Sequence, residues 1–320
     1  MRYNIYGLLL DINVQNTVIR DFFESKFSSF KVERKECVKI IKNLSISERK
    51  NVRDFQSLDE LEEKGPHTFE GISNSIFLHG QCYFFKHIYD NFIFWNTDSC
   101  FFYLGNTETY ILTVVCGYLL KQVVGALSDL GIICLHGAGV TVNHDLDNGL
   151  LIFGQSGSGK SSISIKLVEE YKERLICDDV LMLKRVSGHV SGLSNQQFVN
   201  IEKGNLAENY TQLRDYIVES VDPLNTKVKI DLNKYSKNAF APFIVPKTIL
   251  FSSLERGSQC TIRSLKPIVA LQRIVKEVQF YINSQYVPVI YDLIEQCNTY
   301  EIIPSVNLEI TVQEIYRVLS

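Results

Sequence analysis

The feature that most constrains this chain is the segment GQSGSGKS, residues 154–161, which matches the pattern G-x-x-x-x-G-K-S. The apolar run LLIF precedes it and predicts a strand, and ISIKLVEEY follows it and predicts a helix. Glycines let backbone amides turn inward toward phosphate oxygens, and the start of the helix adds a partial positive charge. The strand, loop and helix together predict a phosphate-binding P-loop in a core of mixed α/β class.

Two side chains of this loop have specific expected roles. Lys160 is expected to place its charge on the β- and γ-phosphates, and the Ser161 hydroxyl is expected to bind Mg²⁺. The predicted nucleotide-binding residues are Gly154, Ser156, Gly157, Ser158, Gly159, Lys160, Ser161 and Ser162. The loop alone does not distinguish an ATPase, a GTPase, a kinase or a nucleotide sensor.

An acidic pair follows the next predicted strand. Asp178 and Asp179 come directly after Leu175–Cys177, and we expect that strand to end near the same phosphates. Successive residues at a strand end point in opposite directions, so one carboxylate can face a metal ion while the other accepts a proton from a substrate hydroxyl. The alternative is an acidic turn exposed to solvent.

A histidine precedes the loop. His136 and Gly137 follow an apolar run, Ile132–Leu135, that predicts a buried strand. A histidine at the end of this strand could hold an aspartate by a hydrogen bond or contact a phosphate. A purely structural histidine is the alternative.

These three features, in this order, resemble one known family. Leu135-His136-Gly137, GQSGSGKSS and Cys177-Asp178-Asp179-Val180 are similar to the catalytic core of bacterial HPr kinase/phosphorylase and the HPr-kinase-related kinases, over about residues 130–183. The resemblance implies a P-loop core related to phosphoenolpyruvate carboxykinase and phosphorylation of a serine hydroxyl. It also implies that Asp178 is the base, that Asp179 assists Mg²⁺, and that His136 orients or tunes Asp178.

The sequence also departs from that family. The glycine- and arginine-rich signature that the bifunctional enzymes carry after the acidic pair is not found in Ser187–Lys237, so HPr as the substrate and a phosphorylase activity are not implied. The related kinases without it include enzymes that phosphorylate the C-terminal serine of lasso precursor peptides. Lys227, Lys229 and Lys237 lie where a substrate- or phosphate-binding segment could be, or they form a solvated basic stretch.

The N-terminal third of the chain has a different pattern. YNIYGLLLDI predicts a strand, Thr17–Phe27 predicts a helix, and the charged stretch Lys42–Gly65 is a helix or a loop. Short aromatic runs separated by turn residues then predict an antiparallel meander, at Ser75–Leu78, Cys82–Ile88, Phe92–Trp95 and Phe101–Leu104. We expect a β-rich α+β domain over residues 1–110, whose aromatic strands form either a peptide-docking surface or an ordinary sheet core.

Residues 111–320 are expected to form the kinase-like domain. A helix is predicted over about 109–129, and Asp145–Gly149 predicts a hairpin turn because Asn-Gly favours positive φ angles. Apolar spacing predicts one helix with Leu206, Tyr210, Leu213 and Ile217, a strand at Lys247–Phe251, and another helix with Ile268, Leu271, Val275 and Val278.

Composition excludes several classes of protein. The formal net charge of −3 gives no electrostatic reason to expect nucleic acid or an acidic membrane as partner. The eight cysteines show no zinc-ligand spacing, which predicts reduced thiols in a cytoplasmic protein. The start lacks a signal-peptide pattern, and the most apolar stretch, Tyr110–Leu120, is shorter than the roughly 18 residues of a membrane span.

The leading hypothesis is therefore a Mg²⁺- and ATP-dependent kinase that phosphorylates a serine on a peptide or small protein. Two alternatives remain: a regulatory or scaffold module that binds a nucleotide without phosphoryl transfer, and a kinase for a free metabolite such as serine or a sugar. The family suggests a homo-oligomer, although no segment of the sequence identifies an interface.

Overall fold

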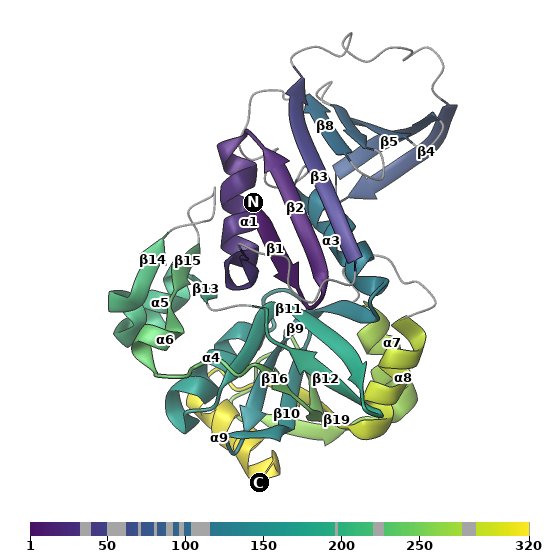
Figure 1. Ribbon diagram of the computed structural model, residues 1–320. Coiled ribbons are helices and arrows are strands. Elements are labelled where there is room, and N and C mark those ends of the chain that lie inside the picture. The colour runs from purple at the N-terminus through teal and green to yellow at the C-terminus, as the bar shows by residue number, and fades with distance from the viewer. Residues whose placement is uncertain are drawn as a thin grey trace. The chain divides into compact units, whose positions relative to one another are not determined.

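The computed structural model describes residues 1–32, 40–49, 62–69, 72–79, 82–87, 92–95, 99–103, 116–195, 198–219, 227–276 and 286–319 (Figure 1). Its contacts divide the chain into two compact units, Met1–Leu130 and Gly131–Ser320. The expected domain boundary near residue 110 lies outside the described residues. Both units combine helices with a sheet that contains parallel and antiparallel neighbours, so the predicted α+β class is confirmed.

The first unit contains one eight-stranded sheet in the order β1-β2-β3-β8-β7-β6-β5-β4. Its strands are β1 (Arg2–Ile5), β2 (Leu8–Val14), β3 (Ile40–Arg49), β4 (Glu62–Phe69), β5 (Ile72–His79), β6 (Cys82–His87), β7 (Phe92–Trp95) and β8 (Ser99–Tyr103). The pairs from β4 to β8 are antiparallel, which confirms the predicted meander. The alternatives of a helix or a loop are wrong for residues 42–49, which belong to β3, and for residues 62–65, which belong to β4.

The predicted first strand is two strands. Tyr6 and Gly7 have φ angles of 51° and 100° and form a tight turn, so β1 and β2 pair as an antiparallel hairpin. Glycine adopts this left-handed conformation without a Cβ clash. The turn was not predicted because the residues on both sides of it are apolar and read as one continuous strand.

The helices of this unit follow the predictions. Helix α1 (Thr17–Phe27) begins after Asn16, whose side chain accepts a hydrogen bond from the Ile19 amide, and a 3₁₀ turn, η1 (Ser28–Phe30), follows it. Ile19, Phe23 and Phe27 are buried on one face. Each such side chain contributes about 1.5–3 kcal/mol when buried. The helix predicted near 109–129 is α3 (Cys116–Ser128) within the described residues.

The second unit is built on another eight-stranded sheet, the large sheet, in the order β16-β12-β11-β9-β10-β17-β19-β18. Its strands are β9 (Ile132–Val142), β10 (Asp145–Phe153), β11 (Leu175–Val186), β12 (His189–Leu193), β16 (Phe243–Ile244), β17 (Pro246–Ser252), β18 (Thr261–Ser264) and β19 (Asn298–Ile303). Strands β10, β17 and β19 are parallel neighbours, whereas β9 runs antiparallel to both β10 and β11.

Helices cover both faces of the large sheet (Figure 1). One face packs against α4 (Lys160–Tyr171) and α9 (Leu308–Leu319), and the other packs against α7 (Pro267–Lys276) and α8 (Tyr286–Gln296). Two separate apolar cores result. No helix among the described residues is long and apolar enough to cross a lipid bilayer.

A second, small sheet contains β13 (Val199–Glu202), β15 (Lys227–Ile230) and β14 (Ile217–Glu219). The single helix predicted here is wrong. Helix α5 (Lys203–Asn209) ends before Tyr210, and a 3₁₀ helix, η5 (Thr211–Tyr216), precedes β14. A short α6 (Leu232–Tyr235) follows β15. Leu206, Tyr210 and Leu213 are nevertheless buried, and they share a core with α4.

One strand end and one hairpin turn in the second unit were predicted wrongly. Strand β9 continues through His136 and Gly137, so the histidine lies inside a strand and not at its end. The β9–β10 hairpin turns at Asn143 and His144, with φ angles of 56° and 60°, whereas Asp145–Gly149 belongs to β10. The cause is Glu173, which is 1% exposed and accepts hydrogen bonds from the amides of Asn143 (2.8 Å) and His144 (3.1 Å).

The acidic pair also lies within a strand. Strand β11 extends to Val186, so Asp178 and Asp179 occupy its middle. Asp179 has a φ angle of 104°, an uncommon conformation for a residue other than glycine. Strand β11 does not pair with β10, the strand that leads into the P-loop, because β9 lies between them.

Candidate active site

The predicted phosphate-binding loop joins β10 to α4, as expected. Gly154, Gly157 and Gly159 all have positive φ angles, and Gly159 directly precedes the first residue of α4. A Cβ atom on Gly154 would lie 2.4 Å from the carbonyl oxygen of Ser252, so this position has no room for a side chain. The loop therefore has the backbone that the glycine pattern predicts, with an α-helix of 12 residues behind it.

Hydrogen bonds from a residue at the end of the loop and from a neighbouring strand hold the P-loop in place. The Lys160 ammonium, on a residue that is 7% exposed, donates to the carbonyl oxygens of Gly154 (2.5 Å) and Gln155 (3.1 Å). From β17, the Ser252 hydroxyl donates to the carbonyl oxygen of Ser158 at 2.7 Å. A lysine held at the centre of the loop is positioned to meet phosphate oxygens that enter it.

A cavity of about 390 Å³ opens beside this loop. The predicted site residues that line it are His136, Ser156, Gly157, Gly159, Lys160, Ser161, Ser162, Asp178 and Asp179. Gly154 and Ser158 do not: Gly154 shapes the loop, and Ser158 is fully buried with a hydroxyl that has no hydrogen-bond partner among the described residues. Residues predicted from three separate segments thus meet in one place.

Asp178 is the buried acid of the site. It is 5% exposed, and its carboxylate is hydrogen-bonded to the Ser161 side chain. Burial raises its pKa to about 6, Asp179 adds to the increase, and the Ser161 hydrogen bond and the charges of Lys160 and Lys227 oppose it. A carboxylate with a pKa near neutrality suits a proton acceptor.

Asp179 points elsewhere. Its side chain is 43% exposed, and its Oδ1 lies 3.2 Å from Nδ1 of His136, which is also 3.1 Å from the Asp179 carbonyl oxygen. The resemblance implied that His136 supports Asp178; the contact that the structure shows for the His136 ring is with Asp179. Because these two residues lie on adjacent strands, the contact follows from the β9–β11 pairing.

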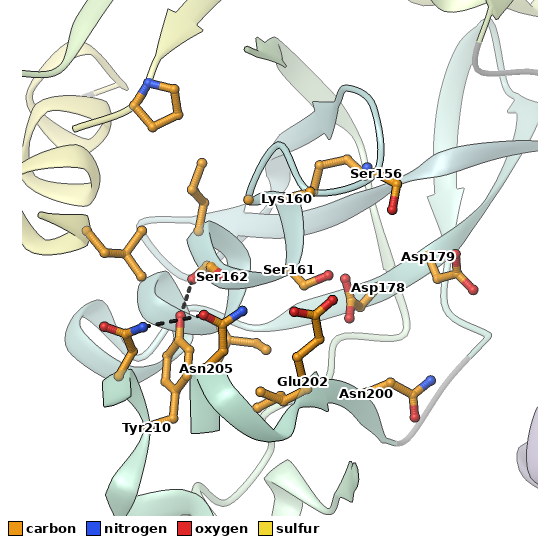
Figure 2. A pocket seen from close by; sticks show the side chains of 18 of the residues that line it. Ser156, Lys160, Ser161, Ser162, Asp178, Asp179, Asn200, Glu202, Asn205 and Tyr210 are labelled. Carbon is orange, nitrogen blue, oxygen red and sulfur yellow. Dashed lines mark hydrogen bonds between the residues drawn. The ribbon is translucent and has the colours of Figure 1, made fainter. Parts of the chain in front are cut away.

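The opposite wall comes from the small sheet and α5, which the sequence did not mark as functional. Asn200, Glu202, Asn205 and Asn209 line the cavity, and the Tyr210 hydroxyl donates to the carbonyl oxygen of Ser162 at 2.7 Å. Figure 2 shows the Glu202 carboxylate pointing toward Ser161 and Asp178. No spacing rule identifies these residues, since they approach the P-loop only through the packing of the small sheet on α4.

Basic residues complete the lining. Lys227 lines the cavity, whereas Lys229 lies 4.3 Å from the ring centroid of Phe198 and Lys237 is exposed outside the cavity. The structure therefore separates the three lysines that the sequence grouped. Arg256, which was not predicted, lines the cavity and donates to the carbonyl oxygen of Gly157 at 3.2 Å.

The donor atoms fit Mg²⁺. Ser161, Asp178 and Glu202 present a hydroxyl and two carboxylates, and Mg²⁺ prefers oxygen ligands. The described part of the chain contains no group of three or more His, Cys, Asp or Glu side chains that could hold a metal by itself. Mg²⁺ in nucleotide sites is usually held by one or two carboxylates together with substrate phosphates, which agrees with this arrangement.

Comparison with solved structures gives a distant likeness. No protein-family model matches the chain, and no curated protein matches its sequence. Among solved structures, the chain is similar to the Hpr(Ser) kinase/phosphatase from Coxiella burnetii, with 15% identity and a TM-score of 0.31 over 58% of this chain and 96% of that chain.

Proposed function

We propose that this protein is a Mg²⁺- and ATP-dependent kinase that phosphorylates a serine hydroxyl on a peptide or small protein. The observation that carries the proposal is the buried Asp178 carboxylate, hydrogen-bonded to Ser161 at the start of α4 and beside the lysine of the loop. A site that only binds a nucleotide has no need for a buried acid with a raised pKa at this position.

The proposed reaction uses these groups directly. Asp178 accepts the proton of the serine hydroxyl, whose oxygen forms a bond to the γ-phosphorus while the bond from that phosphorus to the β,γ-bridging oxygen breaks and ADP leaves. Lys160 and the loop amides stabilise the charge on the transferred group. Mg²⁺, when bound, would neutralise charge on the β- and γ-phosphates, and Ser161 with Glu202 would hold it.

This assignment changes one expected role. The family resemblance implied that Asp179 assists the metal, but the Asp179 carboxylate contacts His136. Glu202 points toward Ser161, so it is the better metal ligand. Asp179 and His136 then act as a pair at the end of the cavity where we expect the acceptor.

The size of the cavity favours a macromolecular acceptor. Its volume of about 390 Å³ is at the low end of the roughly 300–1,000 Å³ typical of small-ligand pockets, so a nucleotide would occupy most of it. A serine presented from outside on a flexible peptide needs room only for its own side chain. A free metabolite would have to fit in the cavity beside the nucleotide.

The test is transfer of γ-labelled phosphate from ATP to a library of serine-containing peptides and to free serine and sugars, with and without Mg²⁺. We expect peptide labelling, and we expect Asp178→Asn to reduce it by about 10²–10⁴-fold while nucleotide binding persists. Glu202→Gln should raise the Mg²⁺ concentration required for half-maximal transfer, whereas Asp179→Asn should leave that concentration unchanged. ATP binding without any labelled product would instead support a regulatory module.

A further inference from the structure

We propose that the end of the cavity away from the acidic pair is a subsite for an adenine base, formed by the Pro304–Leu308 loop on one side and the amides of Asn205 and Asn209 on the other. This inference rests on the proposed nucleotide binding at the P-loop and specifies what lies beyond the phosphates. The site is contained entirely in the second unit.

The cavity has two chemically different ends. Figure 2 shows Asp179 and Asn200 at one end, Ser161 and Glu202 in the middle, and Ser162, Asn205 and Tyr210 at the other end. If the terminal phosphate lies between Lys160 and the acids, the rest of the nucleotide must extend in the direction of Ser162. That direction leads away from all three acids that line the cavity, Asp178, Asp179 and Glu202.

The loop after β19 supplies an exposed apolar surface near this end, because the carboxylate of Glu309, one residue beyond the loop, lies 3.9 Å from the ammonium of Lys166, one turn along α4 from Ser162. Val306 lines the cavity, and at 75% exposure it is the most exposed large apolar side chain among the described residues. Pro304 and Leu308, on either side of it in sequence, also line the cavity. Such a surface is costly to leave in water, and a flat aromatic ring is the part of a nucleotide that would cover it.

This loop is held rigidly. The Val306 amide donates to the carbonyl oxygen of Gly257 (2.9 Å), and the Gly257 amide donates to the carbonyl oxygen of Pro304 (3.0 Å). Ser305 is 3% exposed, its amide donates to the Thr311 hydroxyl (2.8 Å), and its own hydroxyl donates to the carbonyl oxygen of Ser258 (3.2 Å). An apolar side chain on a fixed loop binds a ring with little loss of conformational entropy.

Helix α5, which also lines the cavity, offers hydrogen-bond donors and acceptors that match an adenine base. Asn205 and Asn209 are one turn apart on α5, and the Asn209 amide nitrogen lies 3.5 Å from the Asn205 amide oxygen. A carboxamide has both a donor and an acceptor, which matches the amino group and ring nitrogens of adenine. Guanine offers adjacent N–H donors that a carboxylate would bind best, and the lining acids are in the middle and at the other end of the cavity. The subsite therefore favours adenine.

The experiment compares three probes by calorimetry on the full chain: ATP, GTP and inorganic tripolyphosphate, each with Mg²⁺. The wild-type protein should bind ATP at least about 10-fold more tightly than tripolyphosphate or GTP. Val306→Ser and Asn205→Ala should each weaken ATP binding by about 5-fold, with tripolyphosphate affinity unchanged. Ile268→Ser is the matched control, because Ile268 is 59% exposed on α7 and does not line the cavity.

Failure of the subsite and failure of the proposed function give different results. If both variants bind ATP like the wild type, or lose ATP and tripolyphosphate affinity equally, the base does not lie here. Equal wild-type affinities for ATP and GTP would overturn the selectivity for adenine. If the wild type binds neither ATP nor tripolyphosphate, the P-loop site itself is wrong, and the subsite is rejected with it.

Discussion

Replacing Asp178 with asparagine should make the folded protein more stable at neutral pH while removing its proposed activity. The folded protein holds this carboxylate at 5% exposure, and burial raises its pKa from 3.8 to about 6. Ionising it inside the protein therefore costs free energy at neutral pH. Asparagine has nearly the same shape and no charge, and its amide oxygen can still accept the hydrogen bond from Ser161.

The magnitude follows from the two pKa values. Each pKa unit corresponds to about 1.4 kcal/mol, so the increase at Asp178 corresponds to about 3 kcal/mol. Between pH 3.8 and about 6 the unfolded chain has lost the proton that the folded chain retains, so stability falls as pH rises through this window. Above the window the cost is complete and constant. Asp178→Asn lacks this cost, so its advantage should be near zero at pH 4 and reach as much as about 3 kcal/mol above pH 7.

The assay is thermal unfolding of both proteins from pH 4 to 8, without nucleotide and with a chelator. For a unit of this size, about 3 kcal/mol corresponds to an increase in Tm of about 6–12 °C. Two variants should move the window in opposite directions: Ser161→Ala removes an interaction that lowers the pKa of Asp178, and Asp179→Asn removes one that raises it. An Asp178→Asn protein that is less stable at pH 7, or whose advantage does not depend on pH, would refute the reasoning.

Three further predictions concern the backbone and the second unit. Gly154→Ala should cost about 3 kcal/mol and abolish nucleotide binding, because its Cβ would meet the carbonyl oxygen of Ser252 at 2.4 Å; calorimetry with tripolyphosphate and thermal unfolding check this, and normal binding would contradict it. Glu173→Ala leaves the amides of the β9–β10 turn without their acceptor and should lower Tm by about 10 °C, whereas Glu309→Ala, at a side chain that is 62% exposed, should change it little. Asp179→Gly should be about 1 kcal/mol more stable than Asp179→Ala in denaturant unfolding, because only glycine adopts a φ angle of 104° without strain; equal stabilities would show that the strain is not real.

Local patterns predicted the elements whose structure depends on nearby residues. The helix Thr17–Phe27 was predicted with its observed bounds from its apolar spacing. The P-loop was predicted because the positive φ angles that its backbone needs are allowed sterically by glycine, and the glycines are visible in the sequence. The meander in the first unit followed from turn residues between aromatic runs, although the side chains needed to test a peptide-docking surface there lie outside the described residues.

Long-range contacts explain the errors. Gly137 suggested the end of a strand, but a Cβ there would lie 2.8 Å from the Phe153 ring, so glycine is needed for close packing between paired strands. The hairpin turn was misplaced because Glu173, about 30 residues away, binds the amides of the true turn. The wall that carries Glu202 was missed because only tertiary packing brings it to the P-loop.

The position of β9 between the P-loop strand and the strand of the acidic pair has a consequence for how this site can change. Neighbouring strands are held about 4.8 Å apart by their backbone hydrogen bonds, so the interval between β10 and β11 is about 10 Å and no side-chain substitution can adjust it. The geometry of the proposed reaction is thus set by the main chain. Under the proposed function, variation that changes the acceptor must therefore arise where side chains bound the acceptor end of the cavity, near Asn200 on β13, which makes that part of the wall the place to engineer acceptor selectivity.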